Sequence, residues 1–564
     1  MGLISGFKKF FGVSTPKEAL SHEELQNKLH RSFAMQSFIA GTLGYSFYYV
    51  CRAAINVMKK PIIDSGLLDA DQLGTIGAVS LATYAIGKFV NGFLADYSNI
   101  KRFMATGLII SALACFLMGV AGLIGAEQYS ALIGVDAAAA QKISFFVFIA
   151  FAILWGLSGW AQSMGSPPAI IALSRWFPLS RRGTFYGFFS ASHNIGEGLS
   201  FIFVGSIVAA ASWQWGFFGA AIAGVIGILI ILFMMHDTPE SKGLPSIEVF
   251  AKEKSSGKDA SSKEAQKIAL RTPAVWILAL ASAFMYISRY SLNSWGVLFM
   301  QEEKGFELLE ASAIISINAW MGVIGTVLAG WMSDSLFKGD RKIPAFVAGI
   351  LLSISYAMFI YGGDTRWMTI ASMALFGIAI GVLIAFLGGL MAVDIVPRKA
   401  TGAALGIVGM VSYAAASIQE KVSGWLINKN KVVSEEALTP ETKEMLEKIV
   451  NVAGETTNQL VENINNIEPK LIEAGKNHQV SNDLIEAFAK LGDQVRDFGA
   501  KEVDGAEKIS EEVLKLAQSA LESGKIEVVS YDFSEAAIFW IGASVISFLL
   551  PILLWGKKVK NEGE

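Results

Sequence analysis

The chain has 564 residues, of which 53% are hydrophobic and only 17% are charged, and its mean hydropathy is +0.47. This composition is typical of a polytopic membrane protein and excludes an ordinary soluble enzyme. The net charge of −3 says little, because in such a chain the placement of charge matters more than its sum. Nothing in it indicates a nucleic-acid partner.

Apolar stretches of about 20 residues, long enough to cross a hydrocarbon core of about 30 Å, recur along the whole chain. We expect membrane spans at 33–56, 72–95, 103–126, 143–165, 184–211, 214–235, 273–299, 309–333, 343–362, 367–393, 401–427 and 531–555. The predicted fold is therefore an all-α membrane protein with twelve transmembrane helices.

Basic residues gather in the loops on one side of these spans, together with both chain termini. They are Lys101, Arg102, Arg175, Arg181, Arg182, Lys338, Arg341, Lys342, Arg398, Lys399, Lys557 and Lys558. The positive-inside rule assigns that side to the cytoplasm. We therefore expect a multi-pass protein of the bacterial inner membrane with both termini in the cytoplasm. The two cysteines, Cys51 and Cys115, lie within apolar spans and indicate neither a disulfide framework nor a metal site.

The same pattern divides the chain into six segments. We expect a cytoplasmic N-terminal segment at 1–32, a six-helix half at 33–236, a cytoplasmic middle loop at 237–271, helices seven to eleven at 272–427, an external insertion at 428–530, and the last helix with a cytoplasmic tail at 531–564. The first segment is polar and amphipathic, lacks a signal-peptide cleavage pattern, and is expected to lie on the membrane surface.

Two features of the chain repeat at nearly the same interval. Gly92-Phe-Leu-Ala-Asp96 closes the second span and Gly330-Trp-Met-Ser-Asp334 closes the eighth, so that the two aspartates lie 238 positions apart. Two six-helix halves related by a pseudo-two-fold axis account for this repeat. We expect each aspartate to have a gating or structural role, accepting from backbone N–H groups at a helix end and pairing with nearby arginines, or to mark topology only.

The second repeated feature is an arginine in mid-span. Arg52 and Arg289 lie 237 positions apart, one in the first span and one in the seventh. A charge at the middle of a bilayer costs several kcal/mol, and guanidinium offers a planar fork of donors suited to phosphate. The pair predicts a transporter with a central anion site. The alternative is that each arginine pairs with a buried carboxylate for structural reasons.

Four further motifs narrow the class of transporter. They are Tyr45-Ser-Phe-Tyr-Tyr49-Val-Cys-Arg52, Tyr84-Ala-Ile-Gly-Lys88-Phe, Ser192-His193-Asn194-Ile-Gly196 and Arg289-Tyr290-Ser-Leu-Asn293-Ser-Trp295. With the repeated aspartate turn, they resemble the organophosphate:phosphate antiporters of the major facilitator superfamily. That family includes hexose-6-phosphate and glycerol-3-phosphate transporters and a related sugar-phosphate sensor. The resemblance covers 30–427 and 531–560.

The resemblance implies that the two arginines hold a phosphate from opposite halves and that aromatic side chains line the cavity around it. The substrate-binding set expected on this basis is Arg52, Arg289, Lys88, His193, Tyr45, Tyr49, Tyr84, Tyr290, Tyr413, Asn293, Gln419 and Lys421. Lys88 could instead snorkel towards water, and any one of the tyrosines could be a packing residue. No cofactor, metal or covalent chemistry is expected.

Glu197 departs from the family pattern, in which we expect glycines after the His-Asn pair. It lies four residues after His193, and in a helix the two share a face. A His193–Glu197 pair would hold the imidazole protonated and make affinity fall as pH rises. Alternatively, Glu197 pairs with Lys88 or with another basic residue.

The eleventh span carries three polar residues in a row, Gln419, Glu420 and Lys421, which need a reason in an apolar segment. Lys421 falls where the hexose-6-phosphate transporters have a lysine, and Gln419 could bind sugar hydroxyls. Alternatively, Glu420 and Lys421 lie near the external end and face water. Asp394, at the end of the tenth span, is expected to be a gate or turn residue.

The insertion at 428–530 is mostly polar and is the clearest departure from the family. Apolar residues at three- and four-residue spacing predict helices at 442–452, 459–467, 484–498 and 509–521. We expect a small external helical bundle. It is either a tolerated surface insertion, a lid, or a cap for an unidentified partner.

We therefore expect a monomeric secondary transporter rather than an enzyme. It would exchange a sugar phosphate, with hexose 6-phosphate as first choice, for inorganic phosphate by alternating access. The alternatives are a non-transporting sensor that acts with a membrane histidine kinase, a glycerol-3-phosphate:phosphate antiporter, and a proton-coupled symporter of organic anions.

Overall fold

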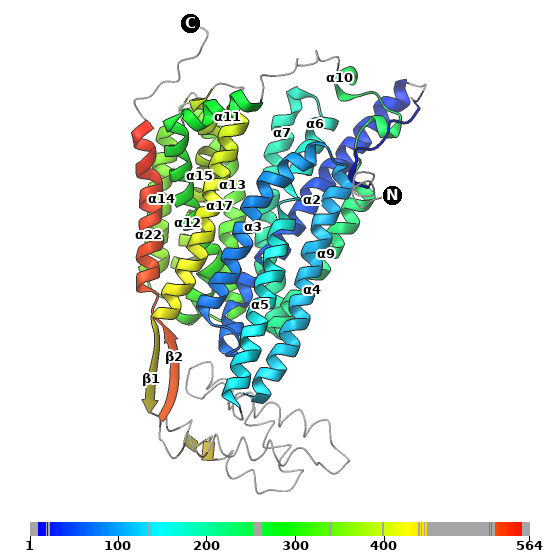
Figure 1. The fold of residues 1–564 in the computed structure, drawn as a ribbon. Helices are drawn as coiled ribbons and strands as arrows, with labels where there is room; N and C mark the ends of the chain where they lie inside the picture. Colours follow the sequence, from blue (N-terminus) through cyan, green and yellow to red (C-terminus); the bar gives the residue numbers. More distant parts are fainter. Residues whose placement is uncertain are drawn as a thin grey trace, which may run out of the picture. The chain divides into compact units, whose positions relative to one another are not determined.

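The computed structural model describes residues 10–18, 20, 23–132, 136–251, 262–337, 341–396, 400–437 and 525–554, with a few single positions between 440 and 521. The chain divides into two compact units. One comprises residues 1–428 and 533–564, and the other comprises residues 429–532. The larger unit contains the helical bundle shown in Figure 1.

Six spans form the N-terminal half of the bundle. Its helices are α2 (Glu23–Asp64), α3 (Ala70–Asp96), α4 (Ile100–Leu132), α5 (Ala137–Gln162), α6 (Ser166–Trp176), α7 (Leu179–Ser190), α8 (Ser192–Ala210) and α9 (Trp213–Met234). The fourth span is α5 continued by α6, and the fifth is α7 continued by α8. Short helices α10 (Ile247–Phe250) and α11 (Ser262–Arg271) follow before the second half.

The C-terminal half repeats this arrangement with six more spans. They are α12 (Pro273–Glu302), α13 (Leu308–Trp331), α14 (Lys342–Tyr361), α15 (Arg366–Ala385), α17 (Thr401–Lys429) and α22 (Ser534–Leu549). We call the end where α2 begins and α22 ends the terminal end, and the end where α17 ends and α22 begins the insertion end. The two halves meet where α2 packs on α12 and α8 packs on α13.

Eleven of the described helical segments are long and apolar enough to cross a membrane. The twelfth, α2, lies among them and packs on α8 and α9, but its inner face carries Arg52, Asn56 and Lys59, which lower its hydropathy. The predicted fold of twelve helices in two halves is confirmed. The helix whose hydropathy falls short of that of the other eleven is the one that carries the first central arginine.

Close packing fixes α8 against α2. A Cβ added at Gly196 would lie 2.2 Å from the carbonyl oxygen of Ser46, so only glycine allows the two backbones to approach this closely. The hydroxyl of Ser46 donates to the Ser192 carbonyl (2.9 Å), and that of Ser200 donates to the Val50 carbonyl (3.1 Å). These contacts place His193 and Glu197 of α8 at the level of Arg52 on α2.

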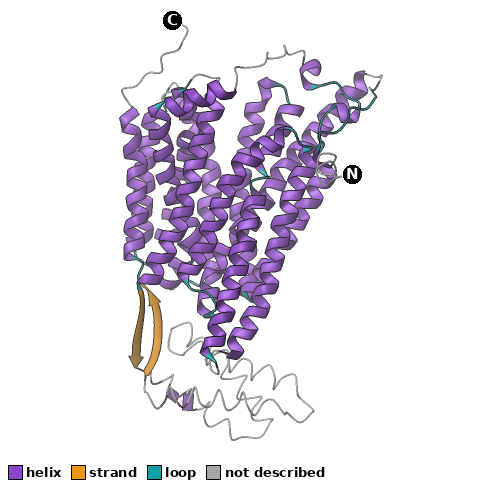
Figure 2. Ribbon diagram, in the orientation of Figure 1, coloured by secondary structure: helices purple, strands orange, loops and turns teal. Residues whose placement is uncertain are grey.

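The described ends of the insertion are two strands, which we did not predict from the sequence; they lie outside the four segments expected to be helical. β1 (Lys431–Ala437) pairs antiparallel with β2 (Lys525–Tyr531), from Lys431 opposite Tyr531 to Ala437 opposite Lys525, and Figure 2 shows this ribbon in orange. Its sequences, Lys-Val-Val-Ser-Glu-Glu-Ala and Lys-Ile-Glu-Val-Val-Ser-Tyr, are rich in the β-branched residues that favour strands. The helices predicted at 442–452, 459–467, 484–498 and 509–521 lie almost entirely outside the described residues.

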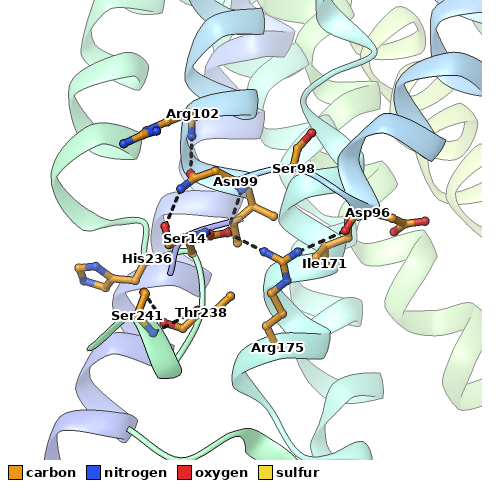
Figure 3. A network of polar contacts seen from close by, with 12 residues as sticks. Ser14, Asp96, Ser98, Asn99, Arg102, Ile171, Arg175, His236, Thr238 and Ser241 are labelled. Atoms are coloured by element: carbon orange, nitrogen blue, oxygen red, sulfur yellow. Dashed lines mark hydrogen bonds and ion pairs between the residues drawn. The ribbon is translucent and has the colours of Figure 1, made fainter. Parts of the chain in front are cut away.

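A polar network at the terminal end ties the N-terminal segment to its half of the bundle (Figure 3). Asp237 is the centre of this network. One carboxylate oxygen accepts from Arg175 (2.6 Å) and from the backbone N–H of Ile100 (3.1 Å), and the other accepts from the N–H of Ser14 (2.7 Å). Asn99 donates to the Ser14 hydroxyl (2.8 Å). Residues 11–18 are thereby held against the turns that follow α3 and α9.

The network corrects the expected role of Asp96. Arg175 reaches only the carbonyl oxygen of Asp96, at 3.5 Å, and makes its ion pair with Asp237 instead. The carboxylate of Asp96 is exposed because α3 ends there and the side chain points away from the turn. The side chain of its repeat partner, Asp334, lies outside the described part of the chain.

His236 lies beside this network, just after α9. Its imidazole Nε2 is 2.9 Å from the amide oxygen of Gln36, and its ring meets the ring of Phe33 edge-on at 4.5 Å. Burial, together with the positive charges of Lys242 and Lys101, lowers the pKa of His236 to about 4. The imidazole is therefore neutral in the folded protein at neutral pH.

The first prediction concerns the paired ends of the insertion. Because Ala437 and Lys525 are the last partners of the ribbon, a two-residue Asn-Gly turn in place of residues 438–524 should close a type I′ hairpin. We expect this variant to reach the membrane and to keep its melting temperature within about 3 °C, since the removed residues belong to the separate unit. Loss of the folded monomer in size-exclusion chromatography would show that the bundle needs the insertion.

The second prediction concerns His236 and pH. In the unfolded chain this histidine is protonated near the ordinary histidine pKa of about 6.5, whereas in the folded protein its pKa is only about 4. Between these values the unfolded state binds more protons, so stability falls as pH falls. The melting temperature should drop less between pH 7 and pH 5 in His236→Gln than in the wild type. Parallel drops in the two proteins would contradict this assignment.

Candidate functional site

The centre of the bundle is built from the same pattern in both halves. Tyr49, Arg52 and Asn56 follow one another at three- and four-residue spacing and share a face of α2. Tyr286, Arg289 and Asn293 do the same on α12, each 237 positions later. The arginines were predicted from the sequence. Asn56 and Tyr286 were missed, although the repeat interval would have found them.

Arg52 lies in a cage of aromatic rings. Its guanidinium carbon is 4.0 Å from the ring centroid of Tyr84, 5.2 Å from that of Tyr49, 5.3 Å from that of Tyr413 and 5.9 Å from that of Tyr290. One terminal nitrogen is buried without a hydrogen-bond partner, and within the described residues no carboxylate lies at ion-pair distance. Cation–π contacts compensate part of the lost hydration but leave the positive charge unneutralised.

Arg289 is paired. One of its terminal nitrogens lies 3.0 Å from Glu197 Oε2, and the amide of Asn293 donates to Glu197 Oε1 at 2.8 Å. Both charged side chains are buried, with 4% and 8% of their side-chain surface exposed. Because Glu197 is on α8 and the other two residues are on α12, these contacts join the two halves. The alternative that each arginine pairs with a buried carboxylate therefore holds for Arg289 and not for Arg52.

The expected His193–Glu197 pair is wrong. Glu197 turns towards α12, where the permanent charge of Arg289 is a stronger partner than an imidazole, and His193 instead packs its ring 5.8 Å from that of Tyr49. The Nε2 atom of His193 is buried without a partner. The histidine ring thus lies beside Tyr49, without the carboxylate that was expected to hold it protonated.

Lys88 is the third cation of the centre. Its Nζ lies 4.9 Å from the ring centroid of Tyr413, its side chain is exposed, and no carboxylate pairs with it among the described residues. It lines a hollow of about 270 Å³ with Tyr84 and Asp96 on the terminal-end half of α3. The site therefore contains two cations without carboxylate partners in the described part of the chain, Arg52 and Lys88.

Four tyrosines connect these cations. The ring of Tyr413 lies 4.5 Å from that of Tyr84, 5.2 Å from that of Tyr286 and 6.1 Å from that of Tyr290. Tyr45 is different, because its ring stacks on that of Phe189 at 5.4 Å, whereas the rings around Arg52 in the described structure are those of Tyr49, Tyr84, Tyr290 and Tyr413. The structure therefore brings the other expected tyrosines to the centre and makes Tyr45 a packing residue.

The insertion end of the centre is closed by Lys59 and Glu420. The Nζ of Lys59 lies 3.2 Å from Glu420 Oε2, 2.6 Å from the hydroxyl of Ser294, and 3.3 Å above the ring of Trp295. Lys59 is only 1% exposed and Glu420 3%. Glu420 is therefore buried, which contradicts the alternative that it faces water. Lys59 lies beyond the first span predicted at 33–56 and was missed as a central residue, although its place seven residues after Arg52 puts it on the same helical face.

A cavity of about 40 Å³ lies between Arg52 and this ion pair. Its polar lining residues are Tyr49, Arg52, Asn56, Lys59, Ser80, Glu197, Tyr290, Asn293, Ser294 and Glu420. The side-chain oxygen of Asn293 is buried there without a partner. The cavity is small because the halves touch beyond it, where a Cβ added at Gly74 of α3 would lie 2.9 Å from the Cα of Gly424 on α17.

Lys421 does not reach the central cavity. Its Nζ binds both carboxylate oxygens of Asp71 (2.6 and 2.7 Å), and its side chain is 46% exposed. Consecutive residues of a helix point about 100° apart, so Glu420 and Lys421 cannot both face the centre. Gln419 is buried and donates to Ser423 (2.9 Å) within the C-terminal half, away from the cavity lining. The side chain of Asp394 lies outside the described residues.

In this conformation the central cations are shut off from the insertion end. Lys59–Glu420 and Lys421–Asp71 both cross between the halves at that end. Lys88, by contrast, is exposed in the hollow on the terminal-end part of α3. Within the described residues, the open approach to these cations is therefore on the side of the terminal end.

Comparisons with known proteins identify the family. The family model of the Major Facilitator Superfamily matches residues 41–419. A probable hexose phosphate transport protein of Chlamydia muridarum is 31% identical over 432 residues, which cover 72% of this chain and 88% of that protein. The glycerol-3-phosphate transporter of Bacillus subtilis is 29% identical, with 71% and 87% covered. The membrane sensor protein UhpC of Escherichia coli is 29% identical, with 69% and 83% covered.

A solved structure supports the same fold. The bacterial homologue of the human lysosomal transporter Spinster, inward-facing and unoccupied, superposes with a TM-score of 0.58 at 16% identity, covering 92% of this chain and 97% of that one. At such identity the likeness concerns the fold alone. The family model and the relatives decide the membership: the chain belongs to the major facilitator superfamily and, within it, to the organophosphate:phosphate antiporter family.

Proposed function

We propose that this protein exchanges a sugar phosphate, with hexose 6-phosphate as the preferred substrate, for inorganic phosphate by alternating access. The observation that carries the proposal is Arg52, a guanidinium in mid-span with a buried, unpartnered nitrogen and no carboxylate beside it within the described residues. Such a group is strongly unfavourable unless an anion binds there. Guanidinium matches phosphate oxygens with two parallel hydrogen bonds.

The cations are distributed so that one phosphate can bridge the two halves. Arg52 on α2 and Lys88 on α3 belong to the N-terminal half, and Arg289 on α12 belongs to the C-terminal half. A phosphate group carries a charge of about −1.5 to −2 at neutral pH. Its attraction to both halves favours a closed centre when the anion is present, which couples the movement of the halves to occupancy.

The contacts at the insertion end are suited to repeated opening. Apart from backbone packing, the halves are held there by polar contacts such as Lys59–Glu420, Lys60–Glu302 and Lys421–Asp71. When the halves rock, water can replace these partners, because charged side chains regain their hydration as the gate opens. The terminal end carries most of the basic loop residues, so we assign it to the cytoplasm of a bacterial inner membrane. The conformation described is then inward-facing.

The choice of sugar phosphate rests on the relatives and on the cavity lining, and no longer on Lys421. The names of the relatives include both hexose phosphate and glycerol-3-phosphate transporters. The closed cavity offers amide and hydroxyl groups of Asn56, Ser80, Asn293 and Ser294, which suit a substrate with several hydroxyls. A hexose presents more of these than glycerol does.

The third prediction tests the arginine cage. Arg52→Lys keeps the charge but loses the planar fork, so phosphate–phosphate exchange in proteoliposomes should fall about 100-fold or more, as truncation of a buried charge contact costs about 2–5 kcal/mol. The matched control is Arg366→Lys, since Arg366 is 72% exposed and pairs with Glu310 outside the centre. This control should exchange within about twofold of the wild type, as expected for an exposed ion pair. Near-normal exchange in Arg52→Lys would remove Arg52 from the phosphate site.

A further inference from the structure

Glu197 is a carboxylate in the middle of a site that otherwise attracts anions. It is 6% exposed, it lies 3.0 Å from Arg289, and its second oxygen accepts from Asn293. Because it extends from α8 in one half to α12 in the other, its ion pair joins the halves at the level of the central arginines. In the structure described, Glu197 thus occupies a position at Arg289 that an anionic ligand would also take.

This carboxylate balances one of the three central cations, Arg289, which is the most deeply buried of them. Arg52 is surrounded by four tyrosine rings, and Lys88 is exposed and lies over Tyr413. Arg289 is deeply buried, and its charge is balanced by Glu197. A buried cation without a partner is strongly unfavourable, and closing both gates over an empty site would bury all three. Glu197 lowers that penalty without any substrate.

We propose that Glu197 is a tethered counter-anion: it neutralises Arg289 in the empty carrier and is displaced when a substrate phosphate binds. The carrier can then change conformation without cargo, so that it moves its substrate in a net direction as well as by exchange. This proposal rests on the phosphate-exchange function proposed above and goes beyond it, because exchange alone requires no return of the empty carrier.

The hydrogen bonds of Glu197 allow a phosphate to displace it from Arg289. Glu197 uses one oxygen for Arg289 and the other for the amide of Asn293, so the carboxylate can leave the arginine and keep one hydrogen bond. Arg52 and Lys88 have no carboxylate to lose among the described residues, so they can hold the phosphate first. Arg289 joins them once Glu197 has withdrawn. Competition between two anions for one cation weakens the binding of the incoming anion.

A positioning role for Glu197 predicts the opposite result. If the carboxylate only held Arg289 and Asn293 in a productive orientation, its removal would weaken phosphate binding. If it competes with phosphate, its removal strengthens binding. The sign of the change in affinity therefore separates the two roles, and Glu197→Gln tests it because glutamine keeps the shape and one acceptor oxygen but not the charge.

The first experiment measures inorganic phosphate binding to the detergent-solubilised protein by calorimetry. Glu197→Gln should bind phosphate about tenfold more tightly than the wild type, because a competing charge has been removed. The matched control is Glu302→Gln, which removes a carboxylate of 3% exposure that also crosses between the halves, to Lys60, but does not line the central cavity. Its affinity should change less than about threefold. Weaker or unchanged binding in Glu197→Gln, or equal tightening in both variants, would overturn the proposal.

The second experiment compares net movement with exchange in proteoliposomes loaded with labelled phosphate. The wild type should release label into phosphate-free medium as well as into medium containing phosphate. In Glu197→Gln the ratio of net release to exchange should fall about tenfold, whereas Glu197→Asp, which keeps the charge, should stay within about threefold of the wild type. No net release from the wild type, or an unchanged ratio in Glu197→Gln, would overturn the tethered counter-anion. A wild type that neither binds nor exchanges phosphate would overturn the proposed function itself.

Discussion

A half-buried guanidinium at the centre of the bundle, with a buried nitrogen and without a carboxylate partner in the described part of the chain, is the constraint on which the rest of this structure depends. Arg52 is surrounded by the rings of Tyr49, Tyr84, Tyr290 and Tyr413, drawn from both halves. Aromatic faces attract a cation but cannot neutralise it. The hydration that Arg52 loses on burial can therefore be replaced in full only by an anion that enters from outside, and this requirement makes the centre a binding site.

The two halves repeat one pattern but use it differently. The Tyr-x-x-Arg-x-x-x-Asn pattern places Arg52 and Arg289 in equivalent positions, yet among the described residues only Arg289 receives a carboxylate, from Glu197 of the opposite half. A second buried ion pair between the halves lies towards the insertion end, where Lys59 of one half pairs with Glu420 of the other. Charges that face each other across the halves hold this conformation closed at the insertion end. They can exchange partners when the halves move.

The sequence predicted the features that depend on local pattern. Apolar length identified the twelve spans, and a fixed interval identified Arg52 and Arg289. It did not predict which residues face each other, because partner choice depends on helix rotation in three dimensions. Glu197 was assigned to His193, its neighbour on one helix, whereas it turns to Arg289 on another. Lys421 was placed in the cavity, but a rotation of about 100° between neighbours sends Glu420 inwards and Lys421 to Asp71.

Counterflow in proteoliposomes loaded with phosphate tests the central claim most directly, because the claim concerns the phosphate group and not the sugar. External hexose 6-phosphate, glycerol 3-phosphate and the free hexose are offered in turn, each labelled. The account predicts that phosphate esters accumulate against their gradient only when phosphate is inside, with the hexose ester preferred, and that the free hexose does not accumulate. Accumulation of the free hexose, or of esters regardless of internal phosphate, would contradict it.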